Sequence, residues 1–238
     1  MFSQLIEAIK NADIITIISI IITAAVLFLV CMPTHEFAHA YAAYKLGDPT
    51  AKYQGRLTLN PLKHLDIFGF AMMLLLGFGY AKPVPVNMLY LKNRKRDMAI
   101  IAVAGPLMNF MTGVVFVFLS VLTNFIFSKI QINSEALFYI YLILDFTLET
   151  TAYISISLSI FNLIPIPPFD GSRILWAILP DRIYYKIMQY ERFIFIGVLA
   201  LLWFGFLDGP LHFMLVNVLN FLYGLFELIF GGFNGFSF

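Results

Sequence analysis

The stretch PTHEFAHAYAAY, residues 33–44, places two histidines and a glutamate directly after a long apolar run. That run, Ile14–Met32, contains 19 residues and no charge, which is close to the roughly 20 residues that a transmembrane helix needs. His35 and His39 are four residues apart, so on a helix they lie one turn apart on the same face. The pattern predicts a membrane helix that carries a pair of histidines at its end.

The composition predicts a membrane protein with several spans. Of its 238 residues, 61% are hydrophobic and 12% are charged, whereas globular proteins average about 25% charged residues. We therefore expect an all-α polytopic protein of the cell membrane, with about five transmembrane helices in contact with the lipid bilayer and a single domain over residues 1–238. The other long uncharged runs are Met98–Ser128, Thr150–Phe169, Phe193–Leu207 and Gly209–Phe226.

Charge and cysteine content exclude two classes of function. The net charge of +1 leaves no basic surface that would bind nucleic acid. The single cysteine, Cys31, excludes an internal disulfide framework and a zinc site built from cysteines.

A shorter apolar run, Ile67–Ala81, is expected to re-enter the membrane instead of crossing it. Its 15 residues would span about 22 Å as a helix, which is less than the roughly 30 Å hydrocarbon core. With re-entry, 13 of the 15 Lys and Arg residues lie on one face, and only Lys10 and Lys129 lie opposite. Because positively charged loops favour the cytoplasmic side, we expect that face and the histidines to be cytoplasmic.

Two segments after the histidines predict non-helical structure. Thr50–Leu59, TAKYQGRLTL, alternates loosely and contains a glycine, which predicts a small membrane-associated β element of one or two strands. Ala81–Asn87, AKPVPVN, is predicted to be extended, because Pro83 and Pro85 lack backbone donors and fix φ.

The histidine pair is predicted to bind zinc. Two imidazoles one turn apart can hold one Zn²⁺, and Glu36, next to the first, is placed to act on a metal-bound water. A charged group in a membrane helix costs at least ~2.5–3.5 kcal/mol, and such residues usually mark function. Polar packing between helices is the alternative explanation for the two histidines.

A catalytic zinc needs a third protein ligand and one open position. Asp170 is the best candidate, because prolines break the helix before it and the topology puts it on the face that carries His39. An ordinary Asp-Gly turn is the alternative for Asp170. Asn162, eight residues earlier, can donate to a carbonyl oxygen as an oxyanion stabiliser. It can equally cap a helix or bond to a neighbouring one.

Five motifs, in this order, resemble those of the site-2 protease family of intramembrane zinc metalloproteases: HEFAHAYAAYKLGD, GRLTLNPLKHLD, AKPVPVN, AGPLMN and NLIPIPPFDG. The resemblance is to the short bacterial and archaeal branch, which lacks PDZ and CBS domains. It covers residues 14–180, and residues 190–230 are expected to add C-terminal membrane helices. Tyr80 departs from this branch, which usually has tryptophan there.

The resemblance implies a zinc metalloendopeptidase that hydrolyses peptide bonds of membrane-spanning protein substrates. It implies Zn²⁺ as the cofactor, with His35, His39 and Asp170 as its ligands. It also implies that Glu36 is the general base for a zinc-bound water and that Asn162 helps to position or polarise the scissile carbonyl.

The resemblance also suggests how substrate is held and what His64 does. An unwound substrate would pair with the strand edge near Tyr53–Leu59 and with the proline-rich segment. His64 is expected either to support the site or contact substrate, or to be a surface histidine of a loop. Asp145 and Glu149 are expected near the outer interface, after a segment at Ala136–Leu144 that lies along the membrane surface; lining of a polar cavity is the alternative.

Two other classes of function fit the same histidines. A membrane metal transporter would use them as a transit site, but it needs ionisable residues through the whole membrane thickness. Here the ligand candidates cluster at one depth. A catalytically inactive scaffold usually lacks a ligand or the base, and this sequence has all of them.

Overall fold

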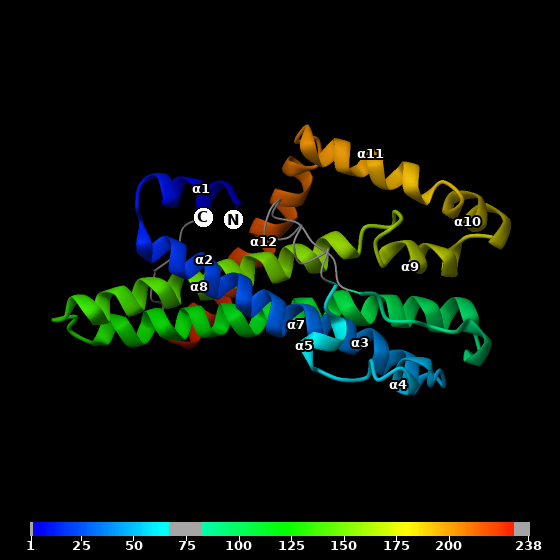
Figure 1. Cartoon of the computed structure of the whole chain (residues 1–238), viewed down its shortest axis with the longest axis horizontal. Coiled ribbons are helices and arrows are strands. Elements are labelled where there is room, and N and C mark those ends of the chain that lie inside the picture. Colours follow the sequence, from blue (N-terminus) through cyan, green and yellow to red (C-terminus); the bar gives the residue numbers. More distant parts are fainter. Residues whose placement is uncertain (1, 67–81, 231–238) are drawn as a thin grey trace.

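The computed structural model describes residues 2–66 and 82–230, and all regular structure in those residues is helical (Figure 1). Two features lie between the helices of the chain's first half: a π-helical turn at Leu27–Cys31 and a 3₁₀ turn at Met88–Tyr90. The helices are α1 (Phe2–Lys10), α2 (Ile14–Val26), α3 (Met32–Lys45), α4 (Thr50–Tyr53), α5 (Pro61–His64), α7 (Arg94–Lys129), α8 (Glu135–Asn162), α9 (Gly171–Ile178), α10 (Asp181–Met188), α11 (Glu191–Trp203) and α12 (Asp208–Ile229).

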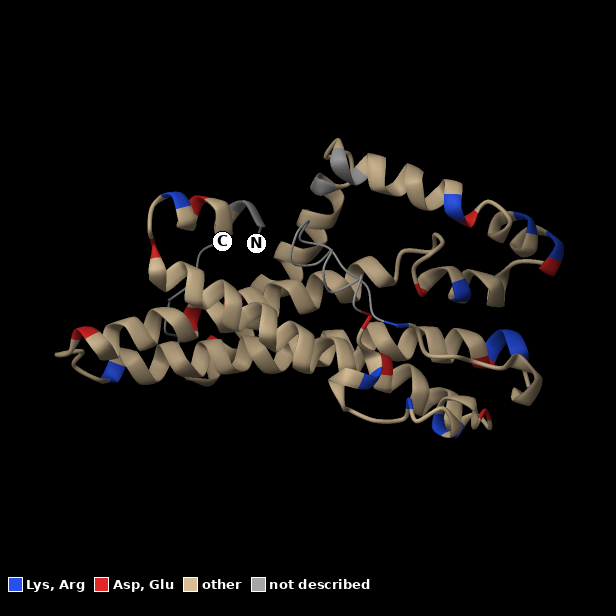
Figure 2. Cartoon of the chain, in the orientation of Figure 1, with Lys and Arg blue, Asp and Glu red and all other residues tan. Residues whose placement is uncertain are grey.

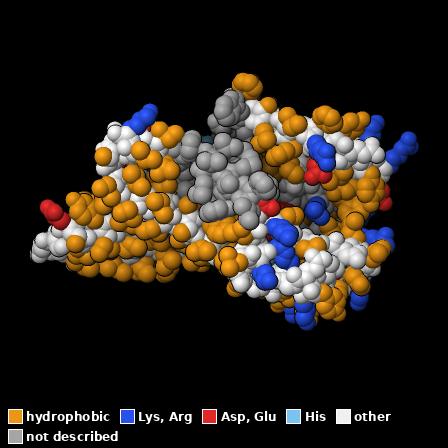
Figure 3. All heavy atoms as spheres, viewed as in Figure 1, with side chains coloured by type: hydrophobic (Ala, Val, Ile, Leu, Met, Phe, Trp, Pro, Cys, Tyr) orange, Lys and Arg blue, Asp and Glu red, His pale blue; other side chains and the backbone are white. Residues whose placement is uncertain are grey.

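Within the described residues, four helical stretches are long and apolar enough to cross a membrane. They are Ile14–Lys45, Arg94–Lys129, Glu135–Asn162 and Gly209–Ile229. The first joins α2, the π turn and α3 without a break, so the histidine pair does lie on the helix that contains the first apolar run. Figure 3 shows apolar side chains covering much of the long-helix surface, as expected for contact with lipid.

The expected fifth span, at Phe193–Leu207, is not among these four. α11 occupies this region but has only 13 residues, about 20 Å of helix. The chain turns directly after it, where Gly205 has a φ of +73°. This conformation suits glycine and ends the helix well before the apolar run ends.

The core of the bundle is formed by α7, α8 and α12. α7 and α8 run side by side in opposite directions (Figure 1), and α12 packs across both. α2 packs along α8 on another side. The fully buried apolar side chains at the centre come from all three core helices: Val117, Val121, Ala152, Ile156 and Leu219.

A second apolar cluster joins α3, α7, α9 and α10 at the histidine end of the molecule. Its buried residues include Ala43, Met98 and Trp176. Lys95 at the start of α7 contacts Asp181 at the start of α10, with 2.8 Å between Nζ and Oδ1. Figure 2 shows that Lys and Arg positions gather along the backbone at this end, with few at the opposite end.

Three expectations about local structure need correction or lie outside the described residues. Thr50–Tyr53 forms the short helix α4, and 54–60 contains no strand, so the predicted β element is absent there. Asp48 precedes this helical turn, and its Oδ1 accepts from the backbone N–H of Thr50, the first residue of α4. Ala136–Leu144 is the first part of α8, not a separate surface segment. The expected re-entrant segment, 67–81, lies outside the described residues.

Candidate metal centre

The two histidines owe their arrangement to a regular helix. Pro33 directly follows the π turn Leu27–Cys31 inside the continuous helix Ile14–Lys45, and it removes one backbone donor from that helix. The helix then continues unbroken to Lys45, so His35 and His39 project from the same face. His39 is buried and His35 is half-buried.

The acidic partner arrives on an irregular segment. α8 ends at Asn162, and the chain then turns through IPIPP before it reaches Asp170 at the start of α9. A Cβ atom on Gly171 would lie only 2.4 Å from the carbonyl oxygens of both Leu163 and Ile164. Only glycine allows this close return of the chain, and the return places Asp170 beside α3.

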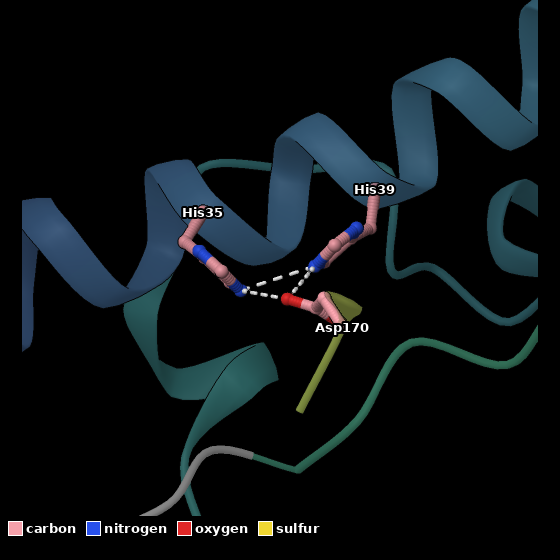
Figure 4. A group of neighbouring side chains, drawn as sticks. All are labelled: His35, His39 and Asp170. Atoms are coloured by element: carbon pink, nitrogen blue, oxygen red, sulfur yellow. Dashed lines mark hydrogen bonds and ion pairs between the residues drawn. The ribbon is translucent and has the colours of Figure 1, made fainter. Parts of the chain in front are cut away.

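The side chains of His35, His39 and Asp170 converge on one point (Figure 4). The Nε2 atoms of the two histidines lie 3.0 Å apart. Oδ2 of Asp170 lies 3.4 Å from Nε2 of His35 and 3.3 Å from Nε2 of His39. Ligands of a tetrahedral zinc, at 2.0–2.2 Å from the ion, lie about 3.3 Å from one another. The separations of the three atoms therefore fit a shared Zn²⁺.

The charge of Asp170 also suits a cation. Burial alone would raise the pKa of its carboxyl group, but the hydrogen bonds and ion pairs with His35 and His39 outweigh burial. They hold that pKa well below its ordinary value. Asp170 is therefore a carboxylate over the whole ordinary pH range, which is the form that binds a metal.

Helix α7 forms the wall behind the histidines. Nδ1 of His39 lies 2.7 Å from the carbonyl oxygen of Ile101, so Nδ1–H donates to that carbonyl and Nε2 is the nitrogen that would bind a metal. Four residues further on, a Cβ atom on Gly105 would lie 2.3 Å from Nε2 of His39 and 2.6 Å from Cε1 of His35. The absence of a side chain at Gly105 is what allows both rings to sit against α7.

A family model matches the part of the chain that contains the triad. The model described as peptidase family M50 matches residues 23–209, which include all three converging side chains. The chain belongs to peptidase family M50.

Relatives of this M50 peptidase carry consistent names. The Bacillus subtilis protein named "Putative zinc metalloprotease YwhC" is 40% identical over 173 residues, which cover 73% of this chain and 76% of that protein. "Zinc metalloprotease MJ0392" of Methanocaldococcus jannaschii is 31% identical over 160 residues, which cover 67% of this chain and 35% of that protein. The M50 peptidase described here is a zinc metalloprotease and a membrane protein. No solved structure matches it significantly.

Glu36 and Asn162 are the two other residues predicted for the M50 site. Glu36 is half-buried on α3, next to His35. Asn162 is the last residue of α8 and is half-buried. Its side chain makes no hydrogen bond within the described part of the chain, so neither of its two predicted roles is decided there.

His64 is not a surface histidine. It is fully buried, and its Nε2 lies 2.8 Å from the carbonyl oxygen of Thr58. Its own carbonyl oxygen accepts from the N–H of Lys82 over 2.9 Å. His64 therefore ties the loop after α4 to the start of the proline-rich segment.

Sequence reasoning missed the part that α7 plays in the site. The AGPLMN motif at 104–109 was recognised only through the family resemblance, with no role for Gly105 or for the Ile101 carbonyl. A glycine beside a proline inside an apolar run was the available signal, because neither residue favours a helix interior. The reason for the glycine became visible only once α7 was placed against α3.

Proposed function

We propose that this M50 peptidase cleaves membrane-spanning protein substrates at membrane depth, through one transmembrane domain with its core at residues 14–180. The observation that carries the proposal is the position of the triad along its helices. His35 lies 21 residues after Ile14, about 32 Å along the helix and close to the roughly 30 Å hydrocarbon core. Gly105 lies eight residues after Asp97, so the centre is about 12 Å inside the charged start of α7.

The distribution of positive charge supports a cytoplasmic site in the cell membrane. Most Lys and Arg positions gather at the triad end of the backbone (Figure 2). Lys10 and Lys129 are the last residues of α1 and α7. Positively charged loops favour the cytoplasmic side of a membrane. The proposal therefore puts the triad near the cytoplasmic face.

The proposed chemistry is hydrolysis of a peptide bond. Zinc held by His35, His39 and Asp170 would act as a Lewis acid and lower the pKa of a bound water from 15.7 to about 7. Glu36 would take the proton from the attacking water and pass it to the leaving amine. The Asn162 amide would donate to the oxygen of the scissile carbonyl and hold the bond in place.

The proline-rich segment supports an extended mode of substrate binding. The backbone N–H of Lys82 bonds to the His64 carbonyl, and that of Asn87 bonds to Asp48, so both ends of the segment are anchored. Between them, the backbone groups of Val84 and Val86 have no partner within the described part of the chain. An unwound substrate would pair with these groups, as in the addition of a strand to an edge.

Replacement of Glu36 tests the proposal. Glu36→Gln keeps the side-chain shape but removes the base, and proton transfer by a positioned group is worth roughly 10²–10⁴-fold. In liposomes with a membrane-spanning reporter, we expect cleavage to fall by that factor while zinc content stays at the wild-type level. Glu135→Gln, an exposed glutamate in the first turn of α8, is the matched control and should cleave normally.

Two outcomes would reject this function. Cleavage by zinc-loaded Glu36→Gln at the wild-type rate would exclude Glu36 as the base. Zinc flux into the liposomes without proteolysis in either protein would indicate transport instead.

A further inference from the structure

The packing of α3 against α7 sets a register between the two helices. They run in opposite directions (Figure 1), and His39 pairs with the Ile101 carbonyl while Gly105 faces both histidine rings. One turn back along α3 from His39 is His35. One turn forward along α7 from Gly105, on the same face, is Asn109. The register therefore brings Asn109 to the level of His35.

Both of these residues carry a polar atom with no partner. Nδ1 of His35 and Oδ1 of Asn109 are shielded from solvent, and neither has a hydrogen-bond partner among the described residues. Asn109 is only 2% exposed. An unsatisfied buried polar atom is destabilising, so two of them on facing helices call for an explanation.

The chemistry of the two atoms is complementary. Nε2 of His35 points at His39 and Asp170 (Figure 4), so its lone pair is the one available to a metal. The proton of the neutral ring then sits on Nδ1, which becomes a donor. Oδ1 of Asn109 is an acceptor. A donor and an acceptor are thus both unsatisfied at one level of the same interface.

We propose that Asn109 is a positioning residue of the metal centre. Its Oδ1 accepts a hydrogen bond from Nδ1–H of His35, through a rotation of the carboxamide or through one buried water. This bond holds the His35 ring in the tautomer that presents Nε2 to the zinc. Asn109 would then do for His35 what the Ile101 carbonyl does for His39.

The proposal rests on the proposed ligand set, and zinc binding tests it without any assay of activity. Loss of a partner that orients a metal-bound histidine costs about 10–100-fold in metal affinity. Asn109→Leu has a similar size but no acceptor, and we expect it to bind zinc 10–100-fold more weakly in competition with a chelator. The cobalt-substituted protein should show an altered visible spectrum, because the His35 ring is no longer held in one orientation.

Two further variants separate this role from a general packing effect. Asn109→Asp keeps an acceptor, and we expect it to retain zinc at least as well as the wild-type protein. Asn124→Leu removes another buried asparagine of α7, which bonds to Tyr141 and Asp145 away from the triad. We expect its zinc affinity and cobalt spectrum to be unchanged.

The outcomes distinguish failure of this inference from failure of the ligand assignment. Full zinc occupancy in His35→Ala would reject the ligand set itself. Normal zinc affinity in Asn109→Leu, or an equal loss in Asn124→Leu, would reject only the role of Asn109. If Asn109→Leu does not fold, Asn109→Asp decides alone, and faster release of zinc from it than from the wild-type protein would overturn the proposal.

Discussion

The backbone N–H of Asn87 donates to Oδ2 of Asp48 over 2.7 Å, although 39 residues separate the two in the sequence. Asp48 is fully buried, and its Oδ1 accepts a second bond, from the N–H of Thr50. One carboxylate therefore fastens the proline-rich segment to the end of α3, the helix that carries both histidines.

Asp48→Ala should release the proline-rich segment without removing the metal. A buried donor that loses its partner costs about 1–3 kcal/mol, so backbone hydrogen exchange over 82–92 should become about tenfold faster or more. Zinc content should not change. Asp13→Ala removes a comparable cap of α2 and should leave exchange over 82–92 as it is. Unchanged exchange in Asp48→Ala would show that the segment is held by other contacts.

Each proposed ligand should be needed for zinc. The purified protein should hold about one zinc ion per chain, and His35→Ala, His39→Ala and Asp170→Ala should each lower its occupancy sharply. Elemental analysis measures this directly. Full occupancy in Asp170→Ala would remove that carboxylate from the ligand set and leave the two histidines with a different third partner.

Gly105→Ala should damage the centre through a single methyl group. That methyl would lie 2.3 Å from Nε2 of His39, so the ring must move, and a displacement of about 1 Å can cost on the order of 10²-fold in rate. We expect a drop of that size in cleavage of a reporter, together with weaker zinc binding. Gly224→Ala on α12 meets no atom within 4 Å and should change neither property. Wild-type behaviour of Gly105→Ala would mean that the rings do not sit against α7.

Accessibility labelling should find the basic end of the molecule on one side of the membrane. Single cysteines placed at Lys52, Lys95 and Lys186, in a variant that lacks Cys31, should all react from the cytoplasm, and one at Lys129 should react from outside. Reaction of position 52 from outside would show that the chain crosses the membrane between 52 and 95, and the charge argument would then be wrong.

Sequence patterns predicted the histidine helix and its partner because both depend on short-range rules. A four-residue spacing determines a helix face, and the prolines before Asp170 end α8 whatever packs around it. The number of spans between His39 and Asp170 predicted that both lie on the same side of the membrane. Each of the four spans in the described residues likewise overlaps an uncharged apolar run of the sequence.

The remaining features depend on contacts that no local pattern contains. The strand prediction at Thr50–Leu59 was wrong, because Thr50–Tyr53 forms a helical turn. The buried carboxylate of Asp48 accepts from the first N–H of that turn. The prediction of a fifth span at Phe193–Leu207 was wrong. The apolar run shows only that its residues are hydrophobic, whereas α11 ends at Trp203, before a turn through Gly205. Asp145 was expected near the outer interface, which stays a prediction; its carboxylate accepts from Asn124 on α7, a pairing that the sequence pattern did not contain.

The proposed ligands His39 and Asp170 are 131 residues apart in the chain. An ion bound to both would close a loop of that length, so zinc would act as a removable cross-link between α3 and the segment after α8. Because the ion binds the folded arrangement, it stabilises that arrangement by RT ln(1 + [Zn²⁺]/Kd), about 4 kcal/mol at a thousandfold excess over Kd. A chelator would therefore do more than stop turnover: it would lower the melting temperature and loosen α9 and α10 from the bundle, and added zinc would restore both.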